Sequence, residues 1–143
     1  MGEQLDGCTA LMLAAEHGHL ECLQLLLNAK ADPALVDNRD HDCALTLACK
    51  SEEYECIRAL LAGGADPEAT DAKGLSALMA CAANGATRSM TLVLDAGADL
   101  CRVNDDGASA LWCACLPSRV LMSVRVYLLG DWLHFVRPQV RFV

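Results

Sequence analysis

Nine cysteines are the residues of this sequence with the greatest capacity for chemistry, because thiolates bind zinc and form disulfides. Their spacing argues against a zinc site, since no Cys-x-x-Cys pair occurs. Cys113 and Cys115 are two residues apart, and on a helix such side chains point about 200° apart. Cys22 and Cys56 are 34 residues apart, which suggests equivalent buried places in a repeated helix. We predict reduced cysteines that act as small apolar core residues.

A second candidate group combines His17 and His19 with Glu16 and Glu21, which together offer nitrogen and oxygen ligands in a short stretch. The simpler interpretation is a turn between two helices, with His17 facing solvent. No glycine-rich phosphate loop, nucleophile elbow or paired-carboxylate motif occurs elsewhere. We therefore expect no enzymatic activity, no metal site and no cofactor.

The composition favours helices as the elements that position these side chains. Hydrophobic residues make up 54% of the 143 residues and aromatic residues only 4%, which is typical of closely packed helices rather than β-sandwiches. The first residues do not resemble a signal peptide, and no stretch of the sequence is long and apolar enough to span a membrane. We expect a protein of the cytosol or nucleus.

Two short markers recur at a constant period, which indicates an internal repeat. The pair Ala10-Leu11 returns as Ala44-Leu45, Ala77-Leu78 and Ala110-Leu111, at steps of 34, 33 and 33 residues. The second marker is Ala31-Asp32, and it returns as Ala65-Asp66 and Ala98-Asp99. Because the two markers keep the same separation, the extra residue of the longer step must lie in the first connecting loop.

Each unit has the apolar spacing of two helices joined by a turn. The predicted capping residues of the first helices are Thr9, Ser76 and Ser109. Cys43 lies at the same position in the second unit and is the exception. Glycines are predicted at the left-handed turns that end the helices, namely Gly18, Gly64, Gly85 and Gly97. Glu52 and Lys30 replace glycine at two of these turns. If the backbone stays left-handed there, each replacement costs about 1–2 kcal/mol.

The run Thr9-Ala10-Leu11-Met12-Leu13-Ala14-Ala15, followed by Gly18-His19 and Leu25-Leu26-Leu27, resembles the ankyrin repeat. The resemblance covers residues 4–115, as three full repeats and the start of a fourth. It implies an all-α solenoid of stacked helix-turn-helix units with β-hairpin-like loops, in which the ring of His19 satisfies backbone groups of the turn. The expected domain is 1–116, with repeats at about 4–36, 37–70 and 71–103 and a partial repeat at 104–116.

Ankyrin repeats resemble one another in binding other proteins through loop tips and the exposed side of the first helix. We therefore predict a protein-binding adaptor or scaffold whose acidic loops attract a basic or extended segment and repel nucleic acid. The alternative is that these are ordinary solvated turn residues. The candidate binding residues are Glu16, His17, Asn38, Arg39, Asp40, Asp42, Lys50, Ser51, Asp71, Lys73, Asn84, Asp105 and Asp106.

Residues 117–143 depart from the repeat and form an apolar, basic C-terminal tail. The tail carries a net charge of +3, against −11 for residues 1–116. Val126, Tyr127 and Gly130 remain in phase with the third repeat, so a degenerate second helix is one interpretation. The tail then caps the open end of the array. Alternatively it inserts into a partner or membrane surface, drives self-association, or is the tail of a truncated splice isoform without a role of its own.

Overall fold

The computed structural model describes residues 7–115, and in this part of the chain all regular secondary structure is helical. The predicted tail 117–143 lies outside the described residues. The helices, in chain order, are α1 (Ala10–Glu16), α2 (Leu20–Asn28), α3 (Ala44–Lys50), α4 (Tyr54–Ala62), α5 (Ala77–Asn84), α6 (Thr87–Asp95) and α7 (Ala110–Cys115). The helices therefore follow the predicted period: each of the first three repeats has two helices, and α7 is the first helix of the fourth.

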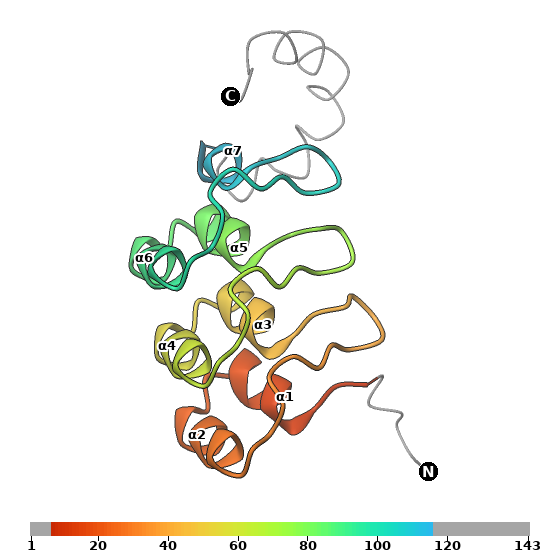
Figure 1. Cartoon of the computed structure of the whole chain (residues 1–143), viewed down its shortest axis with the longest axis vertical. Helices are drawn as coiled ribbons and strands as arrows, with labels where there is room; N and C mark the ends of the chain where they lie inside the picture. Colours follow the sequence, from red (N-terminus) through yellow and green to blue (C-terminus); the bar gives the residue numbers. More distant parts are fainter. Residues whose placement is uncertain (1–6, 116–143) are drawn as a thin grey trace, which may run out of the picture.

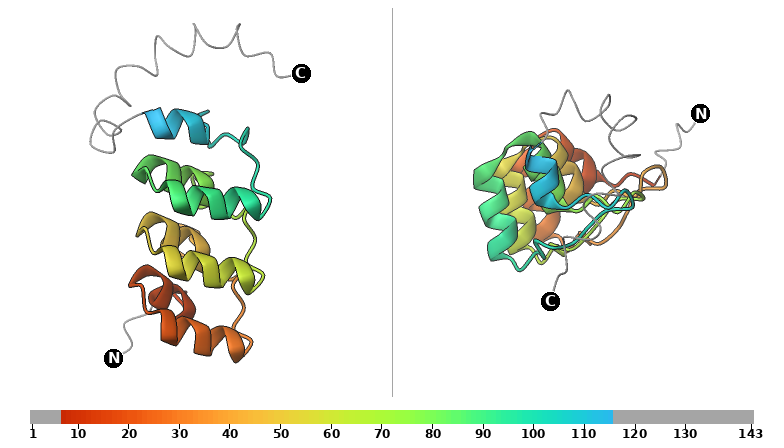
Figure 2. Two further views of the ribbon diagram at one scale, coloured as in Figure 1. Left: turned by 90° about the vertical axis from the view of Figure 1, so that its left-hand side faces the viewer. Right: turned by 90° about the horizontal axis from the view of Figure 1, so that it is seen from above.

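The repeats stack into an elongated array of two helical rows (Figure 1). The first helices α1, α3, α5 and α7 pack in one row, and the second helices α2, α4 and α6 pack in the other. The connecting loops all project to the same side, beyond the row of first helices (Figure 2). The predicted all-α solenoid is confirmed.

Capping side chains fix where each first helix begins. The hydroxyls of Thr9, Ser76 and Ser109 accept the backbone N–H three residues ahead at 3.2–3.3 Å, as predicted. In repeat 2 the Thr46 hydroxyl, inside α3, accepts the backbone N–H of Cys43, the residue before the helix, at 2.9 Å. This is the reverse half of a capping box, in which a side chain one turn inside the helix satisfies the backbone N–H of the N-cap residue.

Left-handed residues end the helices, and two of them are not glycine. Lys30 and Glu52 have φ values of 65° and 62°, close to the 69° of Gly85, so the predicted left-handed turns are confirmed at both. His41 is a third such residue, at φ 58°, and the sequence did not reveal it. It occupies the loop position that Gly74 and Gly107 fill in the next two loops. Three residues other than glycine therefore adopt a left-handed backbone conformation that is unfavourable for residues with a side chain.

The core is a continuous layer of small and branched apolar side chains between the rows. Cys49, Cys56 and Cys81 are at most 1% exposed and pack among Leu45, Leu60 and their neighbours. The prediction of equivalent burial is wrong for Cys22, which is exposed. Cys22 lies on α2, whereas Cys56 lies on α4, which packs against both α2 and α6. A cysteine at one repeat position is therefore core or surface according to its place in the array.

Each loop is a narrow hairpin closed by one isolated antiparallel bridge, as the repeat predicted. The bridges join Val36 to Cys43, Thr70 to Ser76 and Val103 to Ser109. The first loop is one residue longer between its bridge residues, which confirms the predicted place of the extra residue. An Asp or Asn lies at the start of each loop, namely Asp37, Asp71 and Asn104. One side-chain oxygen of each accepts two backbone N–H groups of its loop at 2.8–3.1 Å, which keeps the loop closed.

Candidate functional surface

Neighbouring loops are joined to one another by main-chain hydrogen bonds. The N–H of Ala72 donates to the carbonyl of Asp40 at 2.7 Å, and the N–H of Asp105 donates to the carbonyl of Lys73 at 3.0 Å. These bonds do not depend on side chains, so they set the spacing of the loops while leaving the side chains at their tips available. The three loops consequently form one ordered edge along the array (Figure 1).

An ion-pair cluster ties the first two of these loops to helix α3. The Lys50 ammonium lies 2.8 Å from both carboxylate oxygens of Asp42 and 3.0 Å from Asp71, which belongs to the next loop. The carboxylate side chains are only 5% and 7% exposed, against 33% for Lys50. Asp42, predicted as a loop-tip contact for a partner, is therefore placed inside the array and neutralised by Lys50.

The cluster also shifts the pKa values of two of its members. Burial works against the charge of Lys50, but the hydrogen bonds to Asp42 and Asp71 outweigh it and raise the pKa of the ammonium above its ordinary value of 10.5. Burial likewise opposes the charge of Asp71, yet the Leu75 N–H and the Lys50 ammonium lower the pKa of this carboxyl below 3.8. Both groups remain charged at neutral pH, which keeps the tie between loops intact.

Asn84 links the third repeat to the second. Its side-chain amide donates to the carbonyl of Cys49 at 3.3 Å and to the carbonyl of Lys50 at 3.1 Å. These carbonyls belong to the last turn of α3, where helix geometry leaves carbonyls without an intrahelical partner. This predicted binding residue thus already has a structural task, and it is half-buried.

The histidines lie at the turn after α1, as the sequence indicated. His17 is exposed, and its Nδ1 donates to the Leu13 carbonyl at 3.0 Å. The His17 and His19 rings stack with centroids 6.1 Å apart. The resemblance assigned the backbone contact to His19, but the contact is made by His17. Glu16, just before this turn, is exposed on the row of first helices.

The other predicted binding residues divide by exposure. Asn38, Arg39, Asp40, Lys73 and Asp105 are exposed at the loop tips, and Asp106 is half-buried. Ser51 is exposed at the end of α3. The loops all project to one side of the array (Figure 2), and we call their exposed tip residues the loop face: Asn38, Arg39, Asp40, Lys73 and Asp105.

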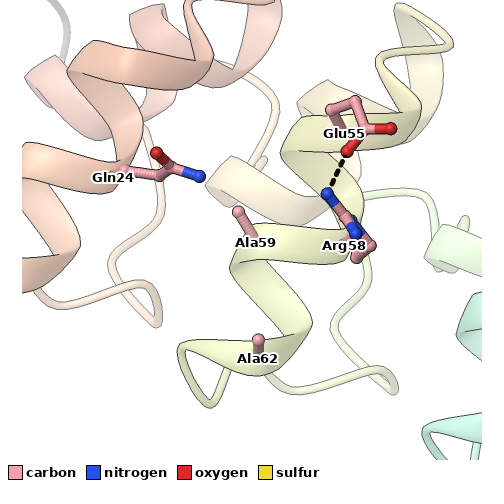
Figure 3. Close-up of a pocket in the computed structure, with 5 residues that line it drawn as sticks. All are labelled: Gln24, Glu55, Arg58, Ala59 and Ala62. Atoms are coloured by element: carbon pink, nitrogen blue, oxygen red, sulfur yellow. Dashed lines mark hydrogen bonds and ion pairs between the residues drawn. The ribbon is translucent and has the colours of Figure 1, made fainter.

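The opposite side, formed by the second helices, has shallow hollows. One lies between α2 and α4, measures about 250 Å³ and is lined by Gln24, Ala59, Ala62 and the paired side chains of Glu55 and Arg58 (Figure 3). Ligand pockets usually occupy about 300–1,000 Å³ and have polar groups that point inward. Here the two charged side chains pair with each other, so this hollow offers little to hold a small molecule.

Metal ligands do not converge in the described part of the chain. Within residues 7–115, no three side chains of His, Cys, Asp or Glu come together as a group that could hold an ion. No helix within these residues is long and apolar enough to cross a bilayer.

Stacked helix pairs with hairpin loops on one side define the class of helical repeat solenoids. Residues 1–71 match the family model described as ankyrin repeats in three copies. The chain belongs to the ankyrin-repeat family, and the structure extends the same unit through α7. No curated protein matches the sequence. Ankyrin repeats generally mediate protein–protein interaction and are typically non-catalytic.

Proposed function

We propose that the chain is an adaptor that binds a basic or extended segment of another protein on its loop face. The observation that carries this proposal is the main-chain linkage of the loops through Asp40, Ala72, Lys73 and Asp105. A surface that is already ordered loses little conformational entropy when a partner binds. An array of this kind therefore supports recognition by shape and charge.

Charge supports a cationic partner. Residues 7–115 contain 16 acidic and 7 basic residues, and Lys50 is neutralised within the array by Asp42 and Asp71. Asp40 and Asp105 are exposed at the loop tips and add negative charge there. Such a field raises the local concentration of cationic segments and disfavours nucleic acid. The nine cysteines are all free thiols, which fits the reducing cytosol or nucleus.

The test uses a labelled, unstructured Lys- and Arg-rich peptide and follows its binding by fluorescence anisotropy. The double variant Asp40→Lys with Asp105→Lys should weaken binding at least about fivefold, or roughly 1 kcal/mol, because it reverses two exposed charges at the loop tips. Affinity of the unmodified chain should also fall as salt rises from about 50 mM to about 300 mM, since the Debye length shortens.

The matched control is Glu21→Lys with Asp95→Lys, which makes the same change in net charge on exposed positions of the second helices. It should retain most of the affinity. Equal losses in the two double variants would show that only net charge matters, and the loop face would then have no special role. Unchanged affinity in both would remove the electrostatic proposal altogether.

A further inference from the structure

A second shallow hollow lies between the starts of helices α4 and α6. It measures about 250 Å³ and is lined by Glu52, Tyr54 and residues 85–89, which form the turn before α6 and its first residues. In the hollow between α2 and α4, Glu55 and Arg58 neutralise each other. The hollow at the start of α6 differs, because several of its polar groups have no partner.

Ser89 contributes a buried hydroxyl to this hollow. Four polar or charged residues of the described chain are buried, namely Asp42, Thr46, Ser76 and Ser89. The first three have side-chain hydrogen bonds, whereas the Ser89 hydroxyl has none within residues 7–115. Ser89 is only 3% exposed, yet no fully enclosed side-chain oxygen in this part of the chain lacks a partner. The Ser89 hydroxyl therefore opens outward, into the hollow that Ser89 lines.

The backbone at the start of α6 offers two further donors. Ala86 precedes the helix and provides no side-chain cap, and the N–H groups of Arg88 and Ser89 have no acceptor among the described residues. These groups lie at the positive end of the helix dipole, where an anion is favoured. In α2 and α4, Glu21 and Glu55 place a negative charge in the first turn, but α6 has no acidic residue there.

Arg88 places a cation where the two earlier helices have Glu21 and Glu55. Its guanidinium carbon lies 4.4 Å from the centroid of the Tyr54 ring, a contact that holds the side chain beside the hollow. Arg88 has no carboxylate partner within the part of the chain that the structure describes. A cation in the first turn of a helix is unfavourable next to the dipole. An anion bound in the hollow would be attracted by both the cation and the dipole.

We propose that this hollow binds a phosphate monoester, and we call it the α6 site. Its donors are the Arg88 guanidinium, the Ser89 hydroxyl and the two free N–H groups. A phosphate has several acceptor oxygens, and the planar guanidinium matches their geometry. Glu52 also lines the hollow, and its carboxylate limits the affinity for an anion. The α6 site is formed by turn and second-helix residues, so it is distinct from the loop face.

The test follows the backbone amide signals of the ¹⁵N-labelled full chain by NMR during titration with inorganic phosphate at constant ionic strength. The amides of Arg88 and Ser89 should shift with one common dissociation constant. The amides of Glu55 and Cys56, at the equivalent places of α4, should not shift. Arg88→Gln should weaken binding at least about fivefold, because it removes charge-assisted hydrogen bonds. Arg58→Gln makes the same change in net charge at an exposed position of α4 and should leave the affinity unchanged.

Two further variants test the other groups of the α6 site. Ser89→Ala should weaken phosphate binding about two- to fivefold, because it removes the hydroxyl donor. Glu52→Gln should strengthen binding by a similar factor, because it removes the neighbouring negative charge. Unchanged affinity in Ser89→Ala would overturn the α6 site as described, since its buried hydroxyl would then not contact the anion.

A phosphoserine peptide and its unphosphorylated form identify the source of the phosphate. If the phosphopeptide binds at least about tenfold tighter than inorganic phosphate, the site recognises a phosphorylated side chain of a partner. If it binds equally or more weakly, the site takes a small phosphorylated compound. Equal amide shifts at the starts of α4 and α6, or equal losses in Arg88→Gln and Arg58→Gln, would overturn the proposal, because either would show only non-specific attraction of anions. The absence of shifts at Arg88 and Ser89 would overturn it as well.

Discussion

Helices α3 and α7 hold equivalent places in their repeats but have different surroundings. Helix α3 packs against α1, α4 and α5, whereas α7 packs on α5. Leu45 and Cys49 of α3 are 0% exposed, while their counterparts Leu111 and Cys115 are exposed. In a stacked array, burial is decided by neighbours on both sides as well as by residue type. The second repeat, which has neighbours on both sides, is therefore the part of the array in which substitutions report on the interior contacts.

Removing core volume from the second repeat should have the largest effect. Leu45→Ala should lower the free energy of unfolding by about 2–5 kcal/mol, because it leaves a cavity at a fully buried position. Urea denaturation followed by circular dichroism measures the change. The control Leu25→Ala, at a side chain that is 69% exposed, should stay within about 0.5 kcal/mol. Similar losses in the two variants would contradict the difference between covered and uncovered positions.

Breaking the ion-pair cluster should have an intermediate effect. Lys50→Met leaves the buried carboxylates of Asp42 and Asp71 without their cation and should cost about 1–3 kcal/mol in urea denaturation. Arg58→Met removes the cation of an exposed pair with Glu55 and should cost at most about 0.5 kcal/mol. If both substitutions are equally harmless, the tie between loops does not contribute to the stability of the interior.

Relieving the left-handed residue of the second repeat should have the smallest effect, and it should stabilise. Glu52→Gly should raise the free energy of unfolding by up to about 1 kcal/mol, because it removes strain of about 1–2 kcal/mol at φ 62° while glycine loses about 0.5–1 kcal/mol more conformational entropy on folding. Ser51→Gly is the neighbouring control, since φ there is −91° and glycine should be neutral or destabilising. Differential scanning calorimetry compares the two. A gain in Ser51→Gly alone would mean that Glu52 is not strained.

Features with a local cause could be predicted from the sequence. The caps at Thr9, Ser76 and Ser109 could be predicted because each hydroxyl bonds the backbone N–H only three residues ahead. The left-handed turns at Lys30 and Glu52 could be predicted because both residues align with glycines of other repeats. The repeat period also placed the helices and the longer first loop. All of these depend on one unit and its period, which a single sequence displays fully.

Features that arise between repeats could not be predicted in the same way. Lys50 and Asp71 are 21 residues apart, and their contact exists only because consecutive loops stack. The sequence identified both as candidates for binding a partner and gave no sign that they bind each other. The repeat position of Cys22 predicts burial, but Cys22 is exposed on α2, whereas Cys56 is buried on α4, which packs between α2 and α6. Residue type and spacing therefore predict the unit better than its environment.

The hydrogen bonds from Asn84 to the carbonyls of Cys49 and Lys50 have a consequence for how the array comes apart. In a one-dimensional array, each unit has its own folding free energy and shares an interface term with its neighbours. Asn84 adds to that shared term, since opening the third repeat removes its amide from the carbonyls of Cys49 and Lys50 at the end of α3. Fraying from the C-terminal end should thus halt less readily between repeats 2 and 3, and amide hydrogen exchange there should proceed with the two repeats as one cooperative unit.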